Sequence, residues 1–97
     1  MNEDFLDKRI LITGASKGLG WVVAEEFARR GALLMVCGRN EEKLQELKAQ
    51  LPSPDRHAAF AGDLLELEDI VKLDEKCKGF LGGLDVLVHV AGGGYGF

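Results

Sequence analysis

TGASKGLG, residues 13–20, is the stretch that decides the fold of this chain, because its glycines lie where an apolar run meets a helix-like segment. The run KRILITG that leads into it is rich in β-branched residues and predicts a strand buried on both faces. The segment LGWVVAEEFARRG that follows predicts a helix, and Gly31 is a typical residue to end it. The expected inner face of that helix consists of Leu19, Val22, Val23 and Phe27.

The rest of the chain continues this alternation. ALLMVCG predicts a second buried strand, and Asn40 is a typical N-cap for a helix with Glu41 and Glu42 in its first turn. Pro52 ends that helix, whose apolar face consists of Leu44, Leu47 and Leu51. HAAFAG predicts a weaker third strand, DLLELEDIVKLDEKCKG a third helix and LDVLVHVAG a fourth strand. The expected inner side of the third helix consists of Leu67, Ile70, Val71 and Cys77.

Alternating strands and helices with apolar strands predict right-handed β-α-β units and a parallel sheet. We therefore expect an α/β fold, the N-terminal part of a doubly wound Rossmann fold. Its sheet should have about four strands in the order 3-2-1-4, with helices on both faces. Residues 1–97 are expected to form a single dinucleotide-binding domain, without repeats or a linker.

The charge balance excludes some classes of partner. The net charge is -4 and the basic residues alternate with acidic ones, which argues against binding to nucleic acid or to an anionic membrane. The N-terminus lacks the apolar core of a secretory signal, and the apolar run 32–37 is too short to cross a bilayer. Cys37 and Cys77 are far apart and read as small buried residues in a reducing compartment. A cytoplasmic location is therefore expected.

The glycine loop carries the first chemical signal. A glycine loop between a strand and a helix favours phosphate binding, because free N–H groups and the helix dipole face the anion. Gly14, Gly18 and Gly20 together favour a dinucleotide over a tight turn without a ligand. A mononucleotide P-loop fits less well, because Lys17 precedes Gly18 and no hydroxyl residue follows it.

The Thr-Gly-x3-Gly-x-Gly spacing resembles the short-chain dehydrogenase/reductase family over essentially the whole chain. Arg39 after the second strand, Asp63-Leu64 after the third and LDVLVHVAG agree with this resemblance. It implies hydride transfer between a nicotinamide and a small-molecule carbonyl or alcohol, in a protein that is usually a homo-oligomer. The cofactor-binding residues that it implies are Gly14, Ser16, Lys17, Gly18, Leu19, Gly20, Arg39, Asp63, Leu64, His89, Ala91 and Gly92.

The end of the second strand bears on the choice of dinucleotide. An acidic residue there would bind the ribose hydroxyls and repel a 2′-phosphate. This chain instead has Gly38 and the cation Arg39, while Lys17 could approach the same phosphate from the glycine loop. By the resemblance, a basic residue at both places marks NADP(H) enzymes. The alternative is that both cations are ordinary solvated surface charges.

Three further positions have two interpretations each. Asp63 is a candidate helix N-cap, and the resemblance implies that it also accepts a hydrogen bond from the adenine amino group while Leu64 packs on the ring. His89 and Val90 replace the two asparagines usual in the family. His89 therefore reads as a hydrogen-bonded core histidine rather than a catalytic base, and no metal site is expected. Trp21 is expected to pack rather than to bind a partner.

The family's catalytic serine, tyrosine and lysine have no counterpart in these residues. Tyr95 lies two residues before the last residue given and has no lysine after it, while Ser16, Ser53 and Lys17 lie in the wrong elements. The chain is thus expected to be the cofactor-binding part of a longer domain, with a bare fourth strand at its edge. The alternatives are a stand-alone NADP(H)-binding module that dimerises through that strand, or a truncated product without function.

Overall fold

The computed structural model describes residues 4–16 and 18–90. Within them, strands and helices alternate along the chain, and the parallel sheet has the order β3-β2-β1-β4, which confirms the predicted fold class and topology. The elements are β1 Arg9–Thr13, α1 Gly18–Arg29, β2 Leu33–Gly38, α2 Glu41–Gln50, a 3-10 helix η1 Pro54–Arg56, β3 Ala58–Ala61, α3 Leu67–Leu81 and β4 Val86–His89.

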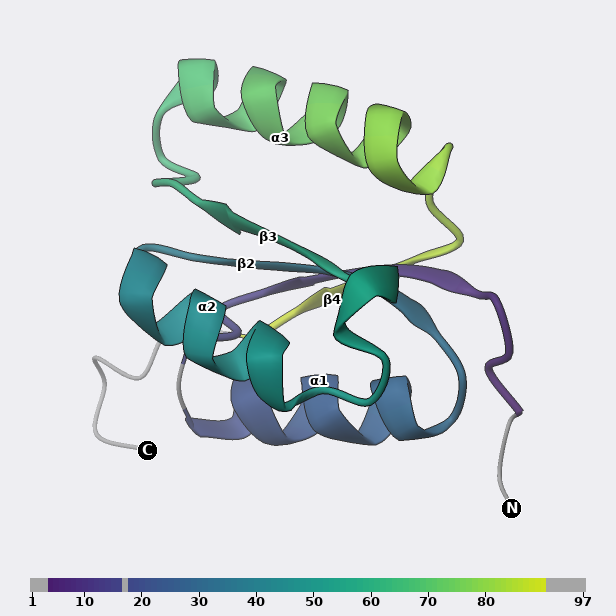
Figure 1. The fold of residues 1–97 in the computed structure, drawn as a ribbon. Helices are drawn as coiled ribbons and strands as arrows, with labels where there is room; N and C mark the ends of the chain where they lie inside the picture. Colours follow the sequence, from purple (N-terminus) through teal and green to yellow (C-terminus); the bar gives the residue numbers. More distant parts are fainter. Residues whose placement is uncertain (1–3, 17, 91–97) are drawn as a thin grey trace.

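The sheet is the middle layer of a three-layer structure. Helices α1 and α2 cover one face and α3 covers the other (Figure 1). Side chains of β1 and β2 alternate between the two apolar layers, so that both strands are buried on both sides as predicted. On the α1 and α2 side the strand residues are Ile10, Ile12, Leu34 and Val36, and on the α3 side they are Leu11, Met35 and Cys37.

The inner face of α1 differs from the prediction. Leu19 and Val22 are 68% and 59% exposed, so their assignment to the core was wrong. The fully buried residues of α1 are instead Gly20, Ala24 and Ala28, while the other two predicted residues, Val23 and Phe27, pack only partly against the core. Small residues let the helix backbone approach the sheet closely, and this contact rotates the larger side chains outwards.

Helix α3 shows the same kind of error. Its buried residues are Leu73, Cys77 and Leu81, of which only Cys77 was predicted. Leu67, Ile70 and Val71 are exposed. Leu73, Cys77 and Leu81 are spaced four residues apart and form one row along the helix, and this row packs on β2 and β3.

Helix α2 follows the sequence prediction. The Asn40 side chain accepts a hydrogen bond from the N–H of Lys43 at 3.0 Å, which confirms it as the N-cap. The predicted apolar face of Leu44, Leu47 and Leu51 is buried. This cap fixes the direction of the chain immediately after β2, where the ribose-binding residue of the predicted fold is expected.

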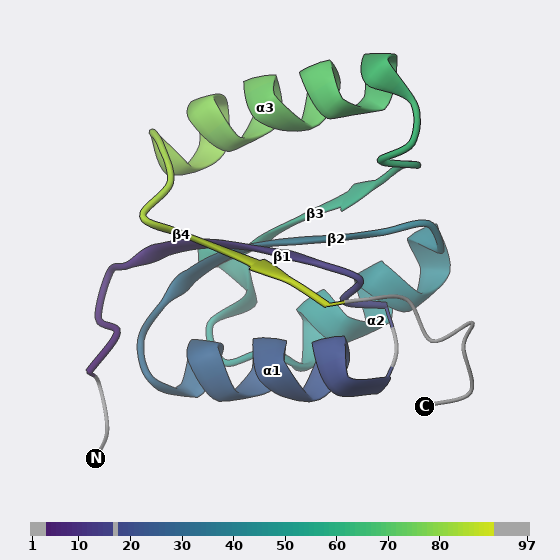
Figure 2. The same ribbon diagram turned by 180° about the vertical axis from the view of Figure 1, so that it is seen from behind.

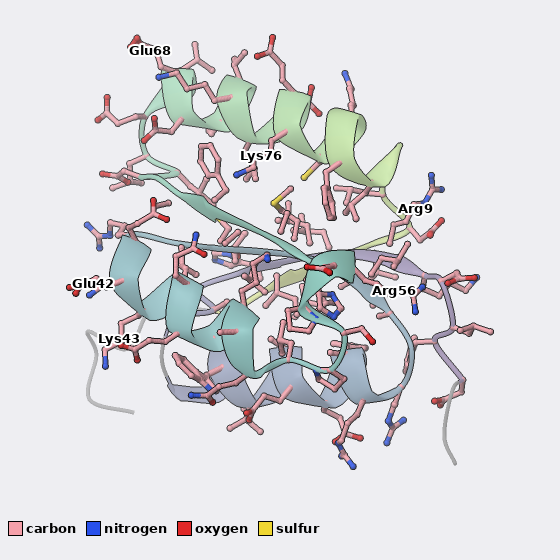
Figure 3. All side chains as sticks on the ribbon, in the orientation of Figure 1. Arg9, Glu42, Lys43, Arg56, Glu68 and Lys76 are labelled. Carbon is pink, nitrogen blue, oxygen red and sulfur yellow. The ribbon has the colours of Figure 1, made fainter. Side chains whose placement is uncertain are left out.

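Strand β4 pairs with β1 at one edge of the sheet (Figure 2). Among the residues that the structure describes, no strand pairs with its other side, and Leu87 is 61% exposed, as expected for a bare apolar edge. Arg9, labelled in Figure 3, fixes the start of this pairing. Its guanidinium donates to both carboxylate oxygens of Asp85 at 3.1 Å. This contact lowers the pKa of Asp85 to about 2.

His57 lies just before β3 and is almost completely buried. Its Nδ1 atom lies 3.1 Å from the N–H of Leu34, and its Nε2 atom lies 2.9 Å from the carbonyl oxygen of Pro52. Nδ1 therefore accepts and Nε2 donates, which is the arrangement of a neutral imidazole. Burial lowers the pKa of His57 from its ordinary value of 6.5.

The stability of the fold should therefore depend on pH through His57. Because its folded-state pKa is lowered, the unfolded state binds a proton first when the pH falls below about 6.5. We expect the free energy of unfolding to decrease from that pH downwards, by at most about 1.4 kcal/mol per pH unit, until the folded-state pKa is reached. Urea unfolding at several pH values, in the wild type and in His57→Gln, measures this slope. Equal slopes in the two proteins would contradict the prediction.

Candidate functional site

The carboxyl ends of the parallel strands meet at one edge of the sheet. Thr13 is in register with Cys37 on one side and with His89 on the other, and Gly38 is in register with Ala61. The loops that follow β1, β2 and β3 and the end of β4 therefore lie at the same edge. This is the edge where open parallel sheets bind their ligands.

The loop after β1 is packed tightly against its neighbours. Gly14 has a φ of +71°, and a Cβ atom there would lie 2.4 Å from the carbonyl oxygen of Val90. A Cβ atom at Gly20 would lie only 2.0 Å from the carbonyl oxygen of Gly14. The N–H of Ala15 donates to the carbonyl oxygen of Cys37 at 3.0 Å and joins the loop to β2. The glycines thus allow an approach of backbone to backbone that no other residue permits.

Helix α1 begins directly after this loop. Its first turn contains no acidic residue, so no carboxylate of that turn faces its free N–H groups. Gly18 has a φ of +60°, and the space where its Cβ atom would lie is empty. The helix dipole and the N–H groups therefore provide an open place for an anion. Leu19 is exposed beside it, and Lys17 lies outside the described residues.

Ser16 lies at the end of β2, where Arg39 is the first residue after the strand. A Cβ atom at Gly38 would lie 3.0 Å from the Ser16 hydroxyl oxygen, so this hydroxyl lies directly over Gly38. Arg39 is exposed, and no salt bridge to it is found in residues 4–16 and 18–90. Asn40 is occupied as the cap of α2. A hydroxyl group over Gly38 is therefore followed in the chain by an exposed cation, and neither Gly38 nor Asn40 adds a negative charge at this position.

The loop after β3 lies next to the end of β2, because the N–H of Gly62 donates to the carbonyl oxygen of Gly38 at 2.9 Å. The prediction that Asp63 caps the third helix was wrong: α3 begins at Leu67, after Glu66. Asp63 instead forms a local turn, in which its Oδ1 accepts from the N–H of Leu65 at 2.9 Å. Leu64 is half-buried against the apolar layer under α3.

Asp69 contributes to this loop and was missed by the sequence analysis. Its Oδ2 accepts a hydrogen bond from the N–H of Asp63 at 2.7 Å. The only signal in the sequence is an acidic residue near the start of a helix, which the helix dipole explains equally well. The contact depends on where α3 begins, and the pattern of apolar residues does not give that position.

The end of β4 provides one side chain of the predicted site. The Nδ1 atom of His89 lies 2.6 Å from the hydroxyl oxygen of Thr13 on β1. The prediction of a hydrogen bond is thus confirmed, but the prediction of a core position was wrong, because His89 is exposed. Ala91 and Gly92, which were also predicted to bind the cofactor, lie outside the described residues.

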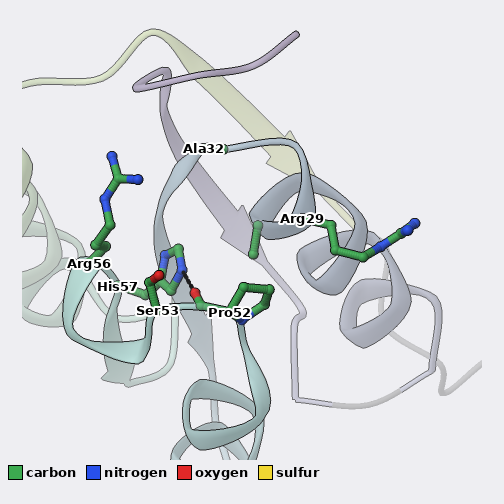
Figure 4. Close-up of a pocket in the computed structure, with 8 residues that line it drawn as sticks. Arg29, Ala32, Pro52, Ser53, Arg56 and His57 are labelled. Carbon is green, nitrogen blue, oxygen red and sulfur yellow. Dashed lines mark hydrogen bonds between the residues drawn. The ribbon is translucent and has the colours of Figure 1, made fainter. Parts of the chain in front are cut away.

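A pocket of about 310 Å³ lies at the opposite edge of the sheet (Figure 4). Its charged lining residues already have partners: Arg29 pairs with Glu26 and Arg56 pairs with Asp7. His57 donates to Pro52, as the dashed line in Figure 4 shows. This pocket is separate from the loops after the strands.

Other features of the described part of the chain fit the same division. It contains no group of three or more metal-ligating side chains and no helix long and apolar enough to cross a membrane. Cys37 and Cys77 are free and buried, and burial raises the pKa of Cys37 to about 11. Trp21, in α1, is partly buried and packs against the core, as predicted.

Comparison with known proteins gives a consistent result. A model of the family described as short chain dehydrogenase matches residues 8–96. Glucose 1-dehydrogenase of Gluconobacter oxydans is 40% identical over 90 residues, which cover 91% of this chain and 34% of the relative. Hydroxysteroid 11-beta-dehydrogenase 1-like protein B of Xenopus laevis is 43% identical over 100 residues, which cover 98% of this chain and 34% of that relative. The chain thus spans about a third of the length of the curated relatives it matches.

Solved structures agree with the sheet topology. Glucose dehydrogenase of Caenorhabditis elegans in its apo form has a TM-score of 0.85 at 33% identity, covering 91% of this chain and 39% of that protein. A 3-ketoacyl-(acyl-carrier-protein) reductase of Brucella melitensis complexed with NADH has a TM-score of 0.81 at 28% identity. The match covers 86% of this chain and 33% of that protein. Both similarities extend over most of the described residues.

Proposed function

Since this chain belongs to the short-chain dehydrogenase family, we propose that it is the NADP(H)-binding part of an oxidoreductase that acts on a carbonyl or alcohol. In this proposal residues 1–97 form one dinucleotide-binding unit. The observation that carries the choice of NADP(H) is the surface at the end of β2, where Gly38 leaves room for the Ser16 hydroxyl and Arg39 provides a cation.

The proposed binding mode follows the loops along the carboxyl edge. The first turn of α1, with Gly14, Gly18 and Gly20, holds the pyrophosphate, because the first N–H groups of a helix have no partner within it and this turn carries no acidic residue. Leu19 belongs to this turn and is exposed. Ser16 and Arg39 hold the 2′-phosphate, and Lys17 is proposed to assist them.

The remaining contacts involve the other two strands. Asp63 accepts a hydrogen bond from the adenine amino group, and Leu64 packs on the adenine ring. His89, Ala91 and Gly92 lie near the nicotinamide ribose, where backbone atoms matter more than side chains. The Thr13–His89 hydrogen bond then keeps β1 and β4 together next to the ribose.

When bound, the cofactor supplies or accepts the hydride, and this chain contributes its binding and orientation. No tyrosine with a lysine four residues later occurs in the 97 residues. In our proposal the groups that transfer the proton therefore belong to further polypeptide. A cytoplasmic location and a homo-oligomeric assembly complete the proposal, in keeping with the buried free thiols and the acidic charge balance.

Titration of the complete polypeptide that carries this sequence, with NADPH and with NADH, tests the proposal. A net preference of about 1.5 to 3 kcal/mol for the 2′-phosphate corresponds to binding that is roughly ten- to a hundredfold tighter for NADPH. The quenching of protein fluorescence measures both dissociation constants. Equal affinities would contradict NADP(H) preference, and a lack of binding to either dinucleotide would contradict the proposed function itself.

A further inference from the structure

Asp69 connects helix α3 to the loop that follows β3. It is located in the first turn of α3 and is half-buried. Its Oδ2 accepts the N–H of Asp63 at 2.7 Å. Gly62 makes room for this contact, because a Cβ atom there would lie 3.2 Å from the same oxygen and 2.5 Å from the ring of Phe60. The side chain therefore reaches the backbone of the loop at a point where only glycine allows it.

Asp63 is held by hydrogen bonds on several sides. Its N–H donates to Asp69, its carbonyl oxygen accepts from the N–H of Glu66 at 2.9 Å, and its Oδ1 accepts from the N–H of Leu65 at 2.9 Å. Within residues 4–16 and 18–90, no hydrogen bond to its Oδ2 is found. The loop thus leaves one carboxylate oxygen of Asp63 available, in a fixed direction, at the ligand-binding edge of the sheet.

We propose that Asp69 is a positioning residue for the adenine end of the cofactor. By holding the N–H of Asp63, it orients the remaining Asp63 oxygen to accept a hydrogen bond from the exocyclic amino group of adenine. Asp69 itself does not contact the ligand. This inference rests on the proposed function, because it requires that the edge binds a dinucleotide with Asp63 at the adenine.

The helix dipole offers a simpler explanation for an acidic residue at this position. Glu68 allows this explanation to be distinguished from a positioning role. Glu68 belongs to the same first turn of α3 and gains the same dipole interaction. It is exposed and lies on the outer side of the helix, away from the sheet (Figure 3). If Asp69 acted only through the dipole, removing either carboxylate would have the same effect on binding.

The test compares NADPH with its hypoxanthine analogue, which carries an oxo group in place of the adenine amino group. We expect Asp69→Leu in the complete polypeptide to reduce the preference for NADPH over the analogue about tenfold, the effect of one hydrogen bond to a charged group. The analogue itself should bind no more weakly than to the wild type. Asp69→Asn should keep the wild-type preference, because its amide oxygen still accepts the N–H of Asp63. Glu68→Leu should also keep it.

A double substitution tests whether Asp69 acts through Asp63. Asp63→Ala and the double variant Asp63→Ala/Asp69→Leu should show the same reduced preference. If Asp69→Leu does not fold, Asp69→Ala removes the same acceptor and is measured in its place. Equal weakening of both ligands, or an unchanged preference, would overturn the inference while leaving the proposed function in place. A wild type that binds neither ligand would overturn the proposed function and this inference with it.

Discussion

Replacing Gly20 with alanine is expected to destabilise the fold by about 3 kcal/mol, at the upper end of the usual effect of overpacking. The new Cβ atom would lie 2.0 Å from the carbonyl oxygen of Gly14 and 2.9 Å from the Cα atom of Ala15. Both neighbours are backbone atoms, so the clash can be relieved only by moving the loop or the start of α1. Neither moves freely, because Gly14 also packs against Val90 and the N–H of Ala15 donates a hydrogen bond to the carbonyl oxygen of Cys37.

The same change should weaken dinucleotide binding. A loop that moves away from α1 no longer presents its N–H groups to the pyrophosphate together with those of the helix. Each charge-assisted hydrogen bond that is lost costs about tenfold or more in affinity. Urea unfolding measures the loss of stability and NADPH titration the loss of binding, both in the complete polypeptide.

Gly79 provides the matched control for this prediction. It also lies inside a helix, α3, and the space where its Cβ atom would lie is empty. Gly79→Ala should therefore stabilise the protein by about 0.5 to 1 kcal/mol, because alanine has the better helix propensity. Replacing glycine with alanine is thus expected to lower the free energy of unfolding at position 20 and to raise it at position 79. A Gly20→Ala protein as stable as the wild type would show that the contact with Gly14 is not tight.

The contrast between these glycines shows what the sequence can and cannot predict. The order of strands and helices followed from the apolar runs. Because β1 and β2 are buried on both faces, their apolar runs identify them as strands without any information about the neighbouring elements. The inner faces of α1 and α3 did not follow. Helix α1 packs through its small residues, whereas α3 packs through a row that begins at Leu73, which lies later in the helix than the predicted Leu67, Ile70 and Val71. Gly20, Ala24 and Ala28 carry little hydrophobic signal and yet form the contact of α1. Counting the larger residues therefore misplaced Leu19 and Val22.

The candidate site divides in a similar way. The position of the glycine loop, Arg39 and Asp63 at the carboxyl edge of the sheet could be predicted, because each lies within two residues of a strand end and strand ends are well defined in the sequence. The contacts that depend on exact helix starts could not be predicted. Asp69 reaches Asp63 only because α3 begins at Leu67, and Ser16 lies over Gly38 only because that residue has no side chain. The predicted caps show the same limit, since Asn40 was correct and Asp63 was not.

Reversing the charge at Arg39 is expected to change the cofactor preference more than any other single substitution. A cation about 4 Å from a phosphate charge is worth up to ~4 kcal/mol at an effective dielectric of 20, and solvent exposure of Arg39 reduces this to a net ~1.5 to 3 kcal/mol. Arg39→Asp removes that attraction and adds repulsion. We therefore expect NADPH affinity to fall about a hundredfold or more, while NADH affinity stays the same or rises because the new carboxylate can accept from the ribose hydroxyls.

The control for this prediction has to separate a local contact from the overall charge of the protein. Lys72→Asp makes the same change in net charge at an exposed position on α3, on the other face of the sheet. It should leave the ratio of NADPH to NADH affinity unchanged. High salt should reduce the preference of the wild type, since at about 1 M the screening length falls to ~3 Å. If Arg39→Asp and Lys72→Asp shift the ratio equally, the preference comes from the general field of the protein, and Arg39 does not bind the 2′-phosphate.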